Sequence, residues 1–177
     1  MSFNTRLLES IQIVTAFPPS DINTDATGDW VSLKWYDGCL VVFHKAAGTA
    51  GDDPSLLMVQ ATDVAGTGSK ALNFTTLYAK VGATALTGVG TFTKYTFTAT
   101  NDLDLVTVGG TDIAADTGEA LCVLDIRASD LDVDGGFDCL QLSIEGDDIG
   151  NSTYAAASYI LYGARYPQAS PISAIAD

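Results

Sequence analysis

The chain has few basic residues, few cysteines and a single histidine. Eight Lys and Arg residues stand against 22 Asp and Glu residues, which gives a formal net charge of −14 over 177 residues. A surface of that sign repels phosphate backbones and anionic lipid headgroups, so we expect neither a nucleic-acid partner nor a membrane partner. The sequence also lacks a long apolar run and a secretory signal, which predicts no transmembrane helix and a start in a cytosol.

The scarcity of cysteine and histidine excludes several kinds of chemistry. The three cysteines, Cys39, Cys122 and Cys139, form no C-x-x-C pair, and with one histidine they do not favour a zinc site or a redox centre. We expect small buried hydrophobes, and a Cys122–Cys139 bridge between neighbouring strands stays open. His44 lies in a predicted strand without a nucleophile elbow, so we expect a surface or interface histidine and no enzyme.

What the sequence does contain is a β pattern. Stretches rich in Val, Ile, Thr, Tyr and Phe alternate with Gly, Asp, Asn and Pro, and helical periodicity is confined to 5–10. This pattern predicts an all-β fold, a β-sandwich or barrel. The predicted strands cover 11–16, 31–36, 40–45, 56–61, 72–79, 91–100, 120–127, 139–145 and 158–166.

Two of these strands have one clearly apolar face. The inward residues are predicted to be Cys122, Leu124, Ile126 and Ala128 in one strand, and Leu140, Leu142 and Ile144 in the other. We expect an N-terminal arm with a short helix at 1–20, a β-sandwich core at 21–166 and a C-terminal tail at 167–177. The Gly- and Thr-rich loops 46–54 and 63–70 are predicted to contact a partner, together with both termini.

One acidic segment resembles half of a calcium-binding loop. Its candidate ligands are Asp130, Asp132, Asp134 and Asp138, and Gly135 stands where a sharp turn is needed. Gln141 occupies the position where the bidentate Glu of an EF-hand is expected. The alternative is an acidic connection between two core strands, in which Gly135 and Gly136 supply the bend.

Several segments together resemble a known family. They are GDWVSLKWYD at 28–37, VVF at 41–43, GTAGDDP at 48–54, ATDVAGTG at 61–68, DLDVDGGFD at 130–138 and ARY at 164–166. This set is similar to small virion structural proteins of tailed phages, and among them it resembles capsid cement (decoration) proteins.

The resemblance implies a jelly-roll-like β core with long loops and extended terminal arms, no catalytic residues and no cofactor. It implies that a homotrimer assembles in the host cytoplasm and seats on the outer capsid surface, where it stabilises the lattice by bridging major capsid proteins. Two alternatives stay open. The chain could be another virion component, of the neck, the tail or the host-adhesion apparatus, or a calcium-dependent carbohydrate-binding module with exposed Trp30 or Trp35.

Overall fold

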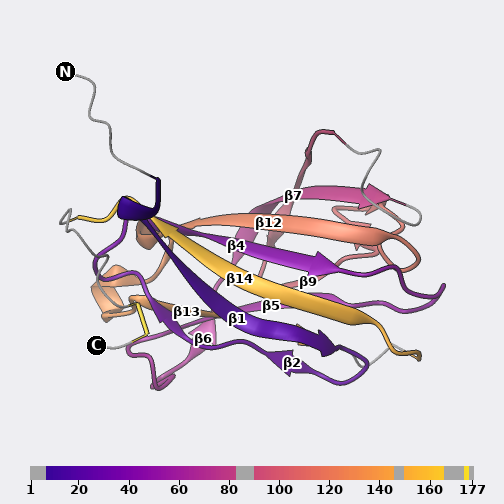
Figure 1. Ribbon diagram of the computed structural model, residues 1–177. Coiled ribbons are helices and arrows are strands. Elements are labelled where there is room, and N and C mark those ends of the chain that lie inside the picture. The colour runs from indigo at the N-terminus through magenta and orange to yellow at the C-terminus, as the bar shows by residue number, and fades with distance from the viewer. Residues whose placement is uncertain (1–6, 83–89, 146–149, 166–173, 176–177) are drawn as a thin grey trace.

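Two antiparallel β-sheets pack face to face and form the body of the chain, which confirms the predicted all-β fold (Figure 1). The structure is a computed structural model that describes residues 7–82, 90–145, 150–165 and 174–175. The strands are β1 (Ile11–Asp21), β2 (Ala26–Thr27), β3 (Val31–Ser32), β4 (Gly38–Lys45), β5 (Ser55–Ala61), β6 (Lys70–Ala71), β7 (Phe74–Gly82), β8 (Thr93–Thr100), β9 (Asp102–Asp104), β10 (Thr107–Val108), β11 (Thr111–Asp112), β12 (Glu119–Arg127), β13 (Cys139–Glu145) and β14 (Tyr154–Tyr162). The described helices are short 3-10 turns, η1 (Leu7–Glu9), η3 (Ala128–Asp130) and η4 (Val133–Gly135). None of them is long and apolar enough to cross a bilayer.

The first sheet, which we call sheet A, contains six strands in the order β1-β14-β4-β12-β7-β8. Its central strands are in continuous register, because Ile160 of β14 lies opposite Leu40 of β4, and Leu40 lies opposite Asp125 of β12. Directly opposed residues of antiparallel strands project their side chains to the same face. The register therefore assigns each side chain of sheet A to the core side or to the outer side.

The second sheet, sheet B, is built on the pairing of β13 with β5, which runs from Cys139 opposite Ala61 to Glu145 opposite Ser55. The short strands β2 and β3 pair with β13, and β6 and β9 pair with β5. Strands β10 and β11 form a separate two-stranded ribbon. The jelly-roll connectivity that the resemblance implies stays a prediction.

The core lies between the two sheets. Its central residues are at most 3% exposed: Cys39, Val41 and Phe43 of β4, Cys122, Leu124 and Ile126 of β12, and Leu140, Leu142 and Ile144 of β13. Burial of one large apolar side chain stabilises the fold by roughly 1.5–3 kcal/mol. The predicted inward sets are thus confirmed, except that Ala128 lies in η3 and is only half-buried. The buried Tyr159 hydroxyl accepts a hydrogen bond from Leu142 N (2.8 Å) and so joins the two sheets.

Most predicted strands are present, with shifted ends. The strand predicted at 31–36 is limited to β3, because Tyr36 N donates to Leu33 O (3.0 Å) and closes a turn. The strand predicted at 158–166 instead covers Tyr154–Tyr162, and Gly163 follows it with a φ of 66°, which ends the extended backbone. The helical turn predicted within 5–10 is η1.

The sandwich begins earlier than predicted. Residues 11–20, which were expected in an N-terminal arm, belong to β1 at the edge of sheet A, so the boundary moves from residue 20 to about residue 10. Of the predicted tail, only 174–175 are described: Ala174 is 1% exposed, and its carbonyl accepts a hydrogen bond from Ser32 N (2.8 Å). This part of the tail therefore packs on its own chain. The rest of the two predicted terminal arms, at 1–6, 167–173 and 176–177, lies outside the described residues.

All three cysteines are buried free thiols. This finding confirms the prediction of small buried hydrophobes, and the bridge between Cys122 and Cys139 is not formed. Burial raises the pKa of the Cys122 thiol to about 12. Since only a thiolate is strongly nucleophilic, Cys122 is unreactive at neutral pH.

Candidate functional site

The acidic connection between β12 and β13, which carries the predicted calcium ligands, folds as a capped turn. Asp132 precedes η4, and its Oδ1 atom accepts a hydrogen bond from Gly135 N (3.0 Å). Gly136 follows with a φ of 81°, which the absence of a Cβ atom allows. This geometry is that of the acidic connection with a glycine bend.

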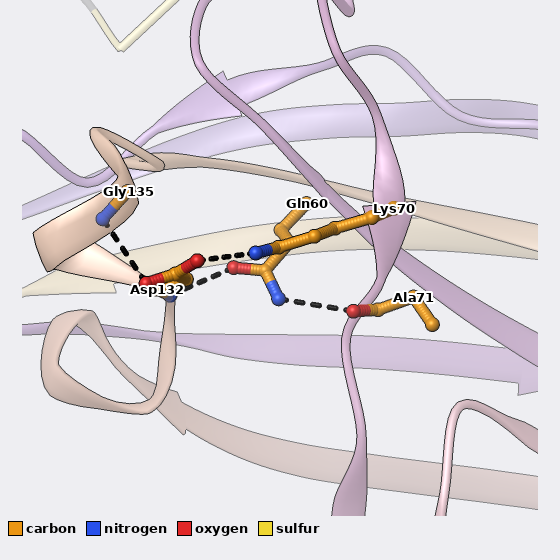
Figure 2. A network of polar contacts seen from close by, with 5 residues as sticks. All are labelled: Gln60, Lys70, Ala71, Asp132 and Gly135. Atoms are coloured by element: carbon orange, nitrogen blue, oxygen red, sulfur yellow. Dashed lines mark hydrogen bonds and ion pairs between the residues drawn. The ribbon is translucent and has the colours of Figure 1, made fainter.

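Figure 2 shows how Asp132 is tied to the neighbouring strands β5 and β6. Its carboxylate forms an ion pair with Lys70 Nζ, which also lies 4.0 Å from the centroid of the Phe137 ring. The backbone N–H of Asp132 donates to Gln60 Oε1 (2.8 Å), and Gln60 Nε2 donates to Ala71 O (3.0 Å). The hydrogen bond from Lys70 is the largest cause that lowers the pKa of the Asp132 carboxyl below its usual value.

The other three candidate ligands point to separate partners or to solvent. Asp130 Oδ2 accepts a hydrogen bond from Arg127 N (2.9 Å), Asp138 Oδ1 accepts one from Cys139 Sγ (3.2 Å), and Asp134 is exposed. Within the described parts of the chain, no group of three or more His, Cys, Asp or Glu side chains is arranged to hold a metal ion. The structure therefore brings no calcium site together here, and calcium binding stays an untested prediction.

His44 lies at the exposed end of β4, as predicted for a strand-surface histidine. Its Nε2 atom lies 2.8 Å from Glu119 Oε1 on the neighbouring strand β12. Both residues line a pocket of about 340 Å³ together with Pro19 and Tyr154. The described lining contains no Ser, Thr or Cys side chain, so the imidazole and the carboxylate have no such nucleophile to activate.

Lys45 is a buried lysine that the sequence analysis missed. It is 0% exposed at the end of β4, and its Nζ atom donates to Ala46 O (2.8 Å), Asp116 O (3.2 Å) and Gly118 O (3.3 Å). Burial is the largest influence and lowers the pKa of Lys45, while the nearby carboxylates of Asp52 and Asp116 favour the charged form. The position could have been found from parity, because residue 45 continues the inward series 39, 41 and 43 of the same strand.

Asp52 holds the loop 46–54, one of the two loops predicted to contact a partner. This carboxylate is 2% exposed; one of its oxygens accepts a hydrogen bond from Thr49 N (2.9 Å) and the other accepts one from Gly150 N (3.0 Å). Residues 49–51 remain exposed at the tip of the loop. The loop is therefore internally fixed and still accessible.

The loop 63–70 is fixed in a similar way. Asp63 Oδ1 accepts hydrogen bonds from Ala65 N (2.9 Å) and Thr67 N (3.0 Å). Gly66 has a φ of 79° and packs so closely on the half-buried Trp30 ring that a Cβ atom there would lie 2.8 Å from Trp30 Nε1. A loop that is already ordered loses less conformational entropy when it binds, so both loops suit the contact role predicted for them.

The side of sheet A that faces away from the core is unusually apolar. We call it the outer face, and the register assigns to it Ile11, Ile13, Thr15 and Asp21 of β1, Tyr154, Ala156, Ser158, Ile160 and Tyr162 of β14, Leu40, Val42 and His44 of β4, Glu119, Leu121, Val123, Asp125 and Arg127 of β12, Thr76, Tyr78 and Lys80 of β7, and Lys94 and Thr96 of β8. A solvated face of an antiparallel sheet normally carries polar residues. The middle of this face instead carries half-buried Leu40, Val42, Leu121, Val123 and Ile160, and Ile13 beside them is 54% exposed.

The sequence already indicated an apolar outer face, but the prediction considered only the inward positions of the strands. In β12 the residues between the inward positions include Leu121 and Val123, and residues 40–43 of β4 are apolar at every position. Continuous apolar runs are typical of strands that are covered on both faces. An apolar sheet face of this kind marks a candidate interaction surface.

The outer face also differs from the rest of the chain in charge. Its bases are Lys80, Lys94 and Arg127, and its acids are Asp21, Glu119 and Asp125. Three bases balance three acids here, whereas 8 bases stand against 22 acids in the whole chain. The outer face is therefore nearly neutral on an otherwise acidic protein.

Comparisons of the chain with protein-family models, with curated proteins and with solved structures give no match. The resemblance to capsid cement proteins consequently rests on the segments of the sequence that carry it.

Proposed function

We propose that this chain is a structural protein of a tailed-phage virion, which decorates the outer surface of the capsid and stabilises it by binding the major capsid protein. The similarity of the segments 28–37, 48–54, 61–68 and 130–138 to that family supports the proposal, and so does the all-β sandwich. In this role the chain acts by adhesion and carries out no reaction.

One observation carries the proposal: the chain is strongly acidic as a whole, but the surfaces suited to protein contacts carry little net charge. A net charge of −14 keeps the chain away from packaged nucleic acid, which suits a position outside the shell. The nearly neutral outer face offers surface on which protein contacts meet little repulsion, and the parts 49–51 and 64–69 of the two loops carry no charged side chain. An acidic body with restricted adhesive regions is what an external coat protein needs.

Stabilisation would come from many modest contacts. Asp52 and Asp63 hold the two loops in fixed conformations, so little loop entropy is lost on binding the shell. When several associated copies of the chain bind adjacent capsid subunits at once, multivalency raises the avidity by roughly 10²–10⁴ over a single contact. Because the chain would bind only assembled subunits, it would shift the equilibrium toward the intact shell.

The proposal is tested with particles that lack the chain, to which the purified full-length chain is added back. We expect occupancy of hundreds of copies per particle and a rise in the temperature at which the shells rupture. Ala50→Glu and Ala65→Glu, in the exposed parts of the two loops, should lower occupancy, whereas Val133→Glu in η4 should not. A handful of copies at one vertex would contradict capsid decoration and would indicate a neck or tail component instead.

A further inference from the structure

We propose that the outer face of sheet A binds the same face of a second copy of this chain, which gives a two-fold pair packed sheet against sheet. This inference goes beyond the capsid role and does not depend on it. It also differs from the three-fold trimer that the resemblance implies, because a face that packs on itself is shared by two chains and closes without a third.

The centre of the outer face is apolar. Val42 and Val123 lie directly opposite each other on the adjacent central strands β4 and β12. Leu40, Leu121 and Ile160 surround them on the same face. Two apolar sheet faces exclude water by stacking about 10 Å apart, as the two sheets of a sandwich do. The outer face thus offers the same kind of surface that the inner face already buries.

The outer face is also large enough to hold a second copy. The central strands β4, β12 and β14 each contain 8 or 9 residues, and the sheet has six strands. At the usual strand spacing and rise, such a face covers about 700 Å². A specific protein interface of standard size buries about 800 Å² per partner. One face is therefore close to the size that a stable pair requires.

The charge of the outer face favours a second copy over another partner. Two chains of net charge −14 repel each other wherever their acidic surfaces meet, but the outer face carries three bases and three acids. A strongly basic partner would instead be drawn to the acidic surface. The outer face is thus the described part of sheet A on which two copies meet with the least repulsion.

Three charged groups of the outer face, Glu119, Asp125 and Lys94, have partners on that same face. Glu119 pairs with His44 (2.8 Å), and Asp125 Oδ1 accepts a hydrogen bond from the Tyr162 hydroxyl (2.6 Å). Lys94 lies over the Tyr78 ring, with Nζ 5.9 Å from its centroid. Burial of a paired charge is far less unfavourable than burial of a lone one, so these groups do not prevent close packing.

The β1 edge of sheet A does not offer an easier route to self-association. At this edge β1 contains Pro18 and Pro19, which have no N–H group to donate to an added strand. Its register with β14 is also broken between Thr15 and Phe17 and again between Phe17 and Ser20. Prolines and bulges of this kind block edge-to-edge pairing, so two copies are not expected to pair through β1.

The test is sedimentation velocity of the full-length chain over a range of concentrations. We expect the wild type to sediment as two chains. Val42→Asp and Val123→Asp each place a carboxylate at the centre of the interface and should weaken the pair at least about 100-fold. Val133→Asp makes the same change on the exposed turn η4 and should leave the pair intact.

A second variant guards against loss of folding. Ser158 lies opposite Val42 on the outer face, and Ser158→Lys adds a long side chain that a single chain can extend into solvent. This variant should keep the circular dichroism spectrum and Tm of the wild type while losing the pair. A wild type that sediments as one chain or as three, or variants that pair like the wild type, would overturn the inference. A third outcome separates the two proposals: the wild type is a single chain, and the variants lose capsid occupancy. The outer face would then bind the shell and not a second copy. This inference would be wrong, although capsid decoration would stand.

Discussion

At the scale of single residues, Lys45 combines a buried charge with contacts to three backbone carbonyls. In Lys45→Met those carbonyls lose their donor and the buried Asp52 carboxylate loses a neighbouring cation. We expect the free energy of unfolding to fall by about 2–4 kcal/mol. Urea unfolding measures the change, and Lys34→Met, which removes an exposed lysine, is the matched control. Equal effects of the two substitutions would contradict the structural role of Lys45.

Because the thiols are buried, we expect the free energy of unfolding to change with pH in the alkaline range. The pKa of Cys122 is raised by burial to about 12 from the ordinary value of 9.0, so between these values the folded chain keeps a proton that the unfolded chain has lost. Stability should therefore fall as the pH rises above 9, by at most about 1.4 kcal/mol per pH unit for each such thiol. Cys122→Ala should give a shallower decline between pH 9 and 11 in urea unfolding. An unchanged slope would show that this thiol is not shielded from water.

At the scale of elements, Asp132 connects η4 with β5 and β6 through Lys70 and Gln60. Asp132→Asn removes the ion pair, and we expect Tm at pH 7 to fall by about 2 °C or more. The pKa of this carboxyl is below its usual value, so its contribution is present above pH 3.8 and is lost as the pH falls through the lowered folded pKa. Asp134→Asn changes an exposed carboxyl of the same turn and should have no effect; a fall of equal size would contradict the specific role of Asp132.

The same connection gives a prediction about calcium. Lys70 occupies the Asp132 carboxylate, and the other three candidate carboxylates do not converge with it. We therefore expect 5 mM calcium to leave Tm unchanged to within about 1 °C. A site with a Kd of about 1 mM would add roughly 1 kcal/mol of stability under these conditions, or about 2–4 °C. A rise of that size, reversed by EDTA, would restore the calcium-loop interpretation.

The elements also show which parts of the fold were predictable. Strands β12 and β13 were predicted closely because an unbroken series of apolar residues at every second position indicates a strand with a buried face. The end of β14 was misplaced because a left-handed glycine at Gly163, and not the apolar pattern, decides where that strand stops.

The candidate sites were harder to predict than the strands. The spacing of the acidic connection suggested calcium, but the contact that engages Asp132 comes from Lys70, which is 62 positions away in the chain. The outer face becomes visible only when the register places Val42 beside Val123.

At the scale of the whole molecule, the net charge of −14 opposes both folding and association. Salt screens this repulsion, because the Debye length falls from roughly 30 Å at 0.01 M to about 10 Å at 0.1 M ionic strength. We expect the urea midpoint to rise and the dissociation constant of the pair to fall at least about threefold between 20 mM and 500 mM NaCl. Sedimentation at the two salt concentrations measures the second effect. Dissociation at high salt would show instead that ion pairs hold the two chains together.

The central claim is that this acidic sandwich acts by adhesion on the outside of a capsid. A cryo-EM reconstruction of purified particles that contain the chain tests it most directly. We expect density for the two-sheet body on the outer surface of the shell, in hundreds of copies. The loops 46–54 and 63–70 should contact the major capsid protein. A shell mapped at side-chain detail without this body on its exterior would contradict it.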